Sequence, residues 1–300
     1  MDEPPLGFRS LRAARRDGRT AIGDEIERHR EAGRRRHSLL LAIALLAATF
    51  FLAPALAEGR GCALPILVYH RFGPSAADSM TVRTSQFEAQ LRYLEDNGYH
   101  VVSLRSVVDC LHKRRADLPD KAVAITVDDG HRTVYTDMLP LIQRYRIPVT
   151  AFIYPSAISN ASYAMTWEQL RQLISTGLFD VQSHTYWHPN FKVEKKRLGS
   201  DEYRLLVKTQ LEKSRRVLRE RLGVDADMIA WSFGIYDDDL VREASAQGYV
   251  AGFTIERRAV RDGDDLMALP RYLMVDSLGL RGFSQLIDES TRNRSNHANP

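Results

Sequence analysis

Hydrophobic and polar positions alternate in two patterns from about residue 64 onward. The run Leu64–His70 is almost continuously apolar, which indicates a short buried strand. In the segment that follows, apolar residues fall at the spacing of one helix face: Phe87, Leu91 and Leu94. Ser85 with Glu88 has the pattern of a capping box at the start of that helix. The pattern therefore predicts a strand and then a helix over residues 64–98.

The same alternation continues to about residue 275. Further strands are predicted over residues 123–127, 148–154, 178–183, 228–232, 249–254 and 268–275, and helices over 133–145, 166–177, 200–222 and 237–247. Strands that alternate with helices imply an α/β fold with a parallel sheet. We predict about seven parallel strands closed, or nearly closed, into a (β/α) barrel. The chemistry of such a barrel lies at the C-terminal ends of its strands.

The N-terminal residues differ in composition from the rest of the chain. Residues 1–37 hold ten Arg and seven acidic residues and are predicted to be a disordered basic leader. Residues 38–57 carry no charge over about the 20 residues that cross a bilayer. Ala55-Leu56-Ala57 has the small-x-small form of a signal-peptidase site, which predicts a signal peptide, with an uncleaved membrane anchor as the alternative. Residues 58–300 are then the folded domain, exported to the periplasm or beyond, or tethered to the inner membrane.

The net charge bears on nucleic-acid binding, and the two cysteines bear on a disulfide. The formal net charge is +4, and three of these charges come from residues 1–37, so the remaining chain is almost neutral. This composition gives no case for a nucleic-acid partner. Cys62 and Cys110 would both face an oxidising compartment, and the sequence leaves open whether they form one disulfide or remain two inert thiols.

Two carboxylates follow one of the predicted strands. The strand ending at Val127 runs directly into Asp128-Asp129-Gly130, and the glycine lets the backbone turn sharply there. Asp-Gly is also a common turn pair, so a solvated turn is the structural alternative. The position at a strand end is what favours a functional site.

Two histidines follow another predicted strand. His184 comes at the end of the strand over 178–183, and His188 follows shortly after it and directly before Pro189. Each imidazole alone is better explained by a structural hydrogen bond. Two imidazoles with one carboxylate leave an open coordination position, which is the composition of a catalytic metal site. We therefore predict a bound divalent metal, with zinc favoured and cobalt, nickel or iron as alternatives.

These motifs resemble one known family. The segments Thr126–Gly130, Ile147–Tyr154 and Ser183–Pro189 are similar to the polysaccharide deacetylase family, also called the NodB-homology domain or carbohydrate esterase family 4. Leu67–His70 and Leu269–Arg271 look more like the branch that deacetylates poly-N-acetylglucosamine in biofilms. The resemblance implies a distorted (β/α) barrel of the NodB-homology type.

The resemblance also implies a division of roles. Asp128 matches the family's general base, and Asp129 matches its metal-ligating aspartate. His184 and His188 match its two metal histidines. The usual late catalytic histidine is missing, and in the biofilm branch the first strand takes its place, which nominates His70 as the general acid. A satisfied core histidine is the alternative for His70.

One family motif is altered in this chain. Many members have Arg-x-Pro-Tyr-Gly where this sequence reads Ala230–Gly234 (AWSFG), without the arginine that steadies the base. Arg271 is a candidate substitute, and a surface ion pair is its alternative role. Trp231 and Phe233 are expected to line the sugar pocket, unless they belong to the core.

The function implied is metal-dependent release of acetate from an N-acetylated amino-sugar polysaccharide. A poly-N-acetylglucosamine-like exopolysaccharide is favoured over peptidoglycan or chitin oligomers. Two other classes stay open. The missing motif arginine suits a catalytically silent saccharide-binding or assembly module, and a narrow closed pocket would suit an amidohydrolase of small amides.

Overall fold

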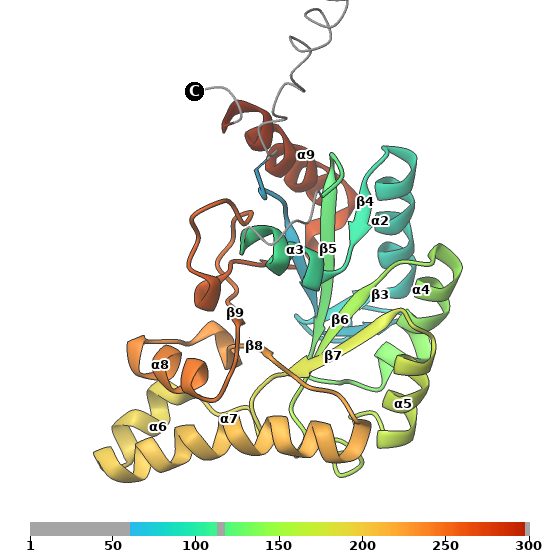
Figure 1. Ribbon diagram of the computed structural model, residues 1–300. Helices are drawn as coiled ribbons and strands as arrows, with labels where there is room; N and C mark the ends of the chain where they lie inside the picture. The colour runs from blue at the N-terminus through green and yellow to red at the C-terminus, as the bar shows by residue number, and fades with distance from the viewer. Residues whose placement is uncertain (1–60, 113–117, 298–300) are drawn as a thin grey trace, which may run out of the picture. The chain divides into compact units, whose positions relative to one another are not determined.

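The structure is a computed structural model that describes residues 61–112 and 118–297 (Figure 1). The predicted leader, residues 1–37, and the uncharged segment 38–57 lie outside the described residues. Among the helices that the structure does describe, none is long and apolar enough to span a membrane.

A single parallel sheet organises the described chain. The strands follow the order β10-β1-β5-β6-β7-β8-β9, and β4 pairs with β5 beside β6. Their bounds are β1 (Ile66–Tyr69), β4 (His100–Val102), β5 (Ala122–Asp128), β6 (Val149–Ile153), β7 (Phe179–Ser183), β8 (Met228–Ala230), β9 (Ala251–Phe253) and β10 (Tyr272–Leu273). A separate pair joins β2 (Arg71–Gly73) to β3 (Thr81–Arg83).

The two ends of the sheet are joined by one segment. The Leu269 N–H donates to the Gly252 carbonyl of β9 at 2.8 Å, and three residues later Tyr272 pairs with Leu67 of β1. The chain from 269 to 273 therefore contacts the first and the last strand of the sheet. This arrangement confirms the predicted distorted (β/α) barrel.

Helices cover the outside of the sheet. They are α2 (Thr84–Asp96), α3 (Leu104–Leu111), α4 (Leu139–Tyr145), α5 (Trp167–Ser175), α6 (Phe191–Arg197), α7 (Ser200–Leu222), α8 (Asp238–Ala246) and α9 (Gly279–His297). In Figure 1, α2, α4 and α5 lie along one side of the sheet, and α6, α7 and α8 gather near β8 and β9. The start of α5 is as predicted, because Thr166 and Gln169 form a reciprocal capping box.

Two local predictions were wrong. The helix α2 begins at Thr84 without a side-chain cap, so Ser85 and Glu88 form no capping box. Its start is set instead by a distant contact, since the N–H of the preceding Arg83 donates to Asp276 Oδ1 at 3.0 Å. The strand predicted over 268–275 shortens to two residues, because a 3₁₀ turn (η3, Leu266–Ala268) precedes it.

Side chains of β5 alternate between two sides of the sheet. Those of Val123, Ile125 and Val127 join the apolar cluster beneath the outer helices, and those of Ala122 and Ala124 join the cluster inside the barrel. Because strand side chains have a period of two, Thr126 and Asp128 continue the inner row. The strand thus brings a carboxylate to the end of the barrel interior.

A disulfide joins Cys62, just before β1, to Cys110 in α3. The bond closes a loop across a sequence separation of 48 residues. Disulfides typically contribute about 2–4 kcal/mol, so we expect the free energy of unfolding of the C62S C110S double variant to be lower than that of the oxidised protein by this amount. Urea titrations with and without reductant measure this, and reductant should leave the double variant unchanged.

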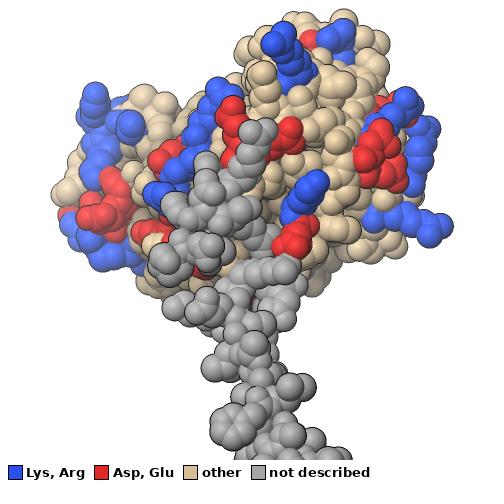
Figure 2. Space-filling model, turned by 90° about the horizontal axis from the view of Figure 1, so that it is seen from above, with Lys and Arg blue, Asp and Glu red and all other residues tan. Residues whose placement is uncertain are grey.

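The surface carries both signs of charge. Figure 2 shows one face, on which basic and acidic side chains are interspersed. Exposed ion pairs such as Arg242 with Asp239 occur within single helices of the described chain. Pairs of this kind contribute little to stability.

Candidate metal centre and active site

The chain turns sharply where β5 ends. Asp129 and Gly130 both have positive φ, at 74° and 76°. A Cβ at position 130 would lie 3.0 Å from the Cδ1 atoms of Ile153 and Ile158, so the close packing as well as the positive φ favours glycine here. The turn directs two successive carboxylates, those of Asp128 and Asp129, to the same edge of the sheet.

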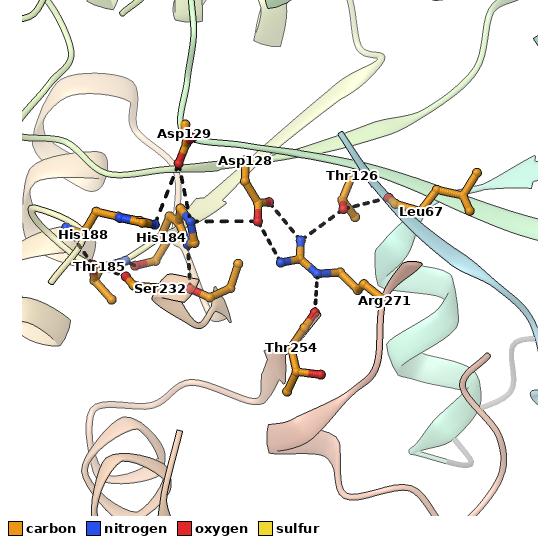
Figure 3. Close-up of polar contacts among 12 residues, drawn as sticks. Leu67, Thr126, Asp128, Asp129, His184, Thr185, His188, Ser232, Thr254 and Arg271 are labelled. Atoms are coloured by element: carbon orange, nitrogen blue, oxygen red, sulfur yellow. Dashed lines mark hydrogen bonds and ion pairs between the residues drawn. The ribbon is translucent and has the colours of Figure 1, made fainter. Parts of the chain in front are cut away.

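Three side chains converge at this edge. The Oδ1 atom of Asp129 lies 3.7 Å from His184 Nε2 and 3.9 Å from His188 Nε2 (Figure 3). One ligand atom from each residue lies within 4.8 Å of the others. These separations are too long for hydrogen bonds. Two ligands at ordinary distances from one tetrahedral ion are about 3.4 Å apart, so the cluster fits a divalent metal after a small contraction.

The histidines are oriented by neighbouring backbone and hydroxyl groups. His184 Nδ1 lies 2.7 Å from the Ala230 carbonyl and must donate to it, which leaves the Nε2 lone pair facing the cluster. His188 has a φ of 61°, and its N–H donates to Thr185 Oγ1 at 3.1 Å. Thr185 in turn contacts Ser232 Oγ at 3.1 Å. These contacts orient the ring of His184 and hold the backbone of His188.

Asp128 forms a buried ion pair beside this cluster. Its two oxygens accept from the two terminal nitrogens of Arg271 at 2.9 and 2.7 Å. Asp128 is 2% exposed and Arg271 is 0% exposed. The sequence left Arg271 with two alternative roles, and the structure places it against Asp128, not on the surface. Figure 3 shows Asp128 between Arg271 and His184.

The other donors of Arg271 also have partners. Its Nε–H donates to the Thr254 carbonyl at 3.0 Å, and one terminal nitrogen donates to Thr126 Oγ1 at 3.1 Å. Burial raises the pKa of Asp128, but Arg271 and His184 outweigh burial and lower it to about 2. The carboxyl group is therefore ionised throughout the neutral range.

His70 follows β1 at the same edge of the sheet. Its Nδ1 is buried and has no hydrogen-bond partner within the described part of the chain. Burial lowers the pKa of His70, although the charges of Asp128 and Asp129 raise it. His70 is therefore close to both carboxylates, and one of its ring nitrogens has no partner.

The two aromatic candidates differ in position. Trp231 is 1% exposed and donates its Nε1–H to the Met267 carbonyl at 2.8 Å, so the expectation that it lines a sugar pocket was wrong. Gly252 makes room for the indole, because a Cβ there would lie 2.6 Å from Trp231 Nε1. Phe233 is 55% exposed, and its ring centroid lies 4.5 Å from that of His188.

Other aromatic residues at this edge were not singled out from the sequence. Tyr154 follows β6, and its ring centroid lies 5.3 Å from that of His188. Its hydroxyl contacts the Tyr163 hydroxyl at 2.6 Å. Together with Trp187, they line an open hollow of about 400 Å³ beside His188. The signal was available, since Tyr154 ends a predicted strand at the same edge as the two aspartates.

Comparison with known proteins identifies the domain. Residues 115–252 match the family model described as polysaccharide deacetylase. A poly-beta-1,6-N-acetyl-D-glucosamine N-deacetylase of Escherichia coli K12 is 26% identical over 73% of this chain, which spans 38% of that protein's length. An enzyme of the same name from Staphylococcus epidermidis is 24% identical over 72% of this chain and 74% of its own length.

Solved structures share the fold. The structure of IcaB from Ammonifex degensii has a TM-score of 0.67 and 25% identity, covering 76% of this chain and 97% of that one. The Streptococcus pyogenes deacetylase PplD in complex with acetate has a TM-score of 0.66 and 22% identity, covering 75% and 98%. The matched family segment contains Asp128, Asp129, His184 and His188, whereas His70 and Arg271 lie outside it. Residues 115–252 thus match the polysaccharide deacetylase family, and the described chain shares its fold with solved structures.

Proposed function

We propose that this domain removes N-acetyl groups from an exported amino-sugar polysaccharide by metal-dependent hydrolysis. The observation that carries the proposal is the position of an ionised, buried carboxylate, that of Asp128, beside a three-ligand cluster. Asp129, His184 and His188 are the proposed ligands, and zinc is the favoured ion. A bound divalent cation would supply a Lewis acid that polarises the amide carbonyl and lowers the pKa of water in the site.

Asp128 is the proposed general base. Arg271 occupies both carboxylate oxygens from one side and keeps the group ionised, while His184 Nε2 lies 3.9 Å from Oδ2 on the other. In the first step Asp128 accepts a proton from water as the new C–O bond forms at the acetyl carbon. Because its two hydrogen bonds hold the Asp128 carboxylate in one orientation, Arg271 is a positioning residue for the base.

His70 is the proposed general acid. When the C–N bond breaks, the amine nitrogen must gain a proton, since an amide anion is a very poor leaving group. The buried, unpartnered Nδ1 of His70 lies at the same strand edge as Asp128 and Asp129. His70 supplies the proton, and the products are acetate and a free amino sugar.

The favoured substrate is a poly-N-acetylglucosamine-like exopolysaccharide. The relatives from Escherichia coli and Staphylococcus epidermidis are named as deacetylases of poly-beta-1,6-N-acetyl-D-glucosamine. The hollow beside His188 is open and lined by Tyr154, Tyr163 and Trp187, whose rings suit the apolar faces of sugars. An open hollow favours a polymer over the small amides considered above.

The direct test is release of free amine from poly-N-acetylglucosamine oligomers by the full chain. We expect activity that a chelator abolishes and added zinc or cobalt restores. Chitin and peptidoglycan fragments are compared in parallel to rank the substrates. A protein that binds one metal tightly and releases no amine from any of the three would contradict the proposal.

A second test isolates the role of His70. We expect His70→Asn to lower kcat on the oligomers by about 10²–10⁴-fold. The loss should be much smaller on an aryl acetate, because a phenolate leaves without a proton. The exposed His100 in β4 provides the matched control, and H100N should behave as the unaltered protein. An equal loss of H70N activity on both substrates would argue against general acid catalysis.

A further inference from the structure

His131 lies at the rim of the candidate site, and none of the roles above uses it. It directly follows Gly130, and its backbone is held against a second loop. The Arg132 N–H donates to the Tyr163 carbonyl at 2.8 Å, and the Met165 N–H donates to the Gly130 carbonyl at 2.9 Å. The loop that presents His131 therefore has a fixed position.

Thr133 orients the imidazole of His131. The Phe72 N–H donates to Thr133 Oγ1 at 3.0 Å, and Oγ1 lies 2.8 Å from His131 Nδ1. The Thr133 N–H also donates to Nδ1, at 3.3 Å. Because Nδ1 accepts from this N–H, the neutral ring carries its proton on Nε2, and the Thr133 hydroxyl is then the donor in its own contact with Nδ1.

The Nε2–H group of His131 is available to a ligand. Within the described residues no hydrogen bond engages this atom, and it is not among the buried atoms that lack a partner. It therefore faces solvent.

Three aromatic rings connect His131 to the proposed metal site: those of Tyr163, Tyr154 and His188. The ring of His131 is nearly parallel to that of Tyr163, with 6.1 Å between centroids and 11° between planes. Tyr163 contacts Tyr154 through their hydroxyls, and Tyr154 packs against His188. This row of rings runs from the proposed metal ligands, past the open hollow, to the Nε2–H donor of His131.

We propose that His131 is a substrate-positioning residue that donates its Nε2 proton to an acceptor oxygen of the polysaccharide. The oxygen is a hydroxyl or N-acetyl carbonyl of a sugar lying against Tyr163. The inference rests on the proposed function and adds a specific contact to it. The tautomer is fixed by Thr133, so the donor is in place before substrate arrives.

Two variants test the contact. His131→Phe keeps a ring against Tyr163 and removes the donor, whereas His131→Gln keeps an N–H donor at similar reach. We expect H131F to raise KM for poly-N-acetylglucosamine oligomers about three- to tenfold, the effect of one lost hydrogen bond, with kcat changed less than twofold. H131Q should recover most of the affinity. H100F, at the exposed His100, is the matched control and should leave KM unchanged.

The outcomes separate the inference from the proposed function. If the unaltered protein deacetylates the oligomers but H131F has the same KM, the contact is wrong and the function stands. If H131F loses both its kcat and its bound zinc, His131 has a structural role and the proposal is overturned. Long-range proton–nitrogen NMR of the neutral ring gives an independent readout. A proton on Nδ1 would contradict the proposed tautomer, in which Nε2 carries the proton.

Discussion

Asp128→Asn is expected to lower kcat by about 10²–10⁴-fold while one metal ion per chain remains bound. The amide is nearly isosteric with the carboxylate but accepts no proton from water. Asp128 lies outside the three-ligand cluster of Asp129, His184 and His188, so the cluster should survive the change. Kinetics on poly-N-acetylglucosamine oligomers and metal analysis of the same preparation measure the two effects.

Asp129→Asn is the matched control, since it makes the same chemical change at the adjacent residue. This variant should lose the metal, because an amide oxygen is a weaker ligand than a carboxylate. Its activity should return in part at high zinc concentration, whereas that of D128N should not. If D128N loses metal as readily as D129N, the two aspartates do not have separate roles.

The fold was predictable from the sequence where packing is local or periodic. The alternation of apolar runs and amphipathic helices predicted a parallel sheet, and α7 spans Ser200–Leu222 as predicted. The features that the sequence did not predict depend on long-range contacts. The start of α2 depends on a hydrogen bond between Arg83 and Asp276, which no local pattern reveals. The last strand is short because it crosses between β9 and β1, a geometry set by closure of the barrel.

The site was predictable to the extent that it follows from strand ends. Asp128, Asp129, His184 and His188 each lie at or just after the end of a buried strand, and parallel strands bring those ends together. The environment of Trp231 was not predictable, because its burial depends on the missing side chain of Gly252. The pairing of Arg271 with Asp128 was expected only through the family resemblance, as one of two roles, because 143 residues separate the two in the sequence.

Arg271→Met should lower the free energy of unfolding at pH 7 by about 3–5 kcal/mol, the second large effect we expect. Methionine fills much of the same volume but leaves the Asp128 carboxylate buried without its partner. Arg271 is 0% exposed and Asp128 2%, so solvent does little to screen the lost pair. Urea titrations of the metal-depleted proteins measure the difference without a contribution from bound metal.

The loss should depend on pH in a defined direction. In the unaltered protein the pKa of Asp128 is lowered to about 2, so its stabilisation is present above the unfolded value of about 3.9 and is lost as pH falls toward 2. Without Arg271, burial raises that pKa, and the variant is penalised most where the carboxylate must ionise. The difference between the two proteins should therefore shrink from pH 7 to pH 3. Adding Asp128→Asn to R271M removes the unpaired charge and should recover part of the stability, whereas a double variant less stable than R271M would show that the buried charge is not the cause.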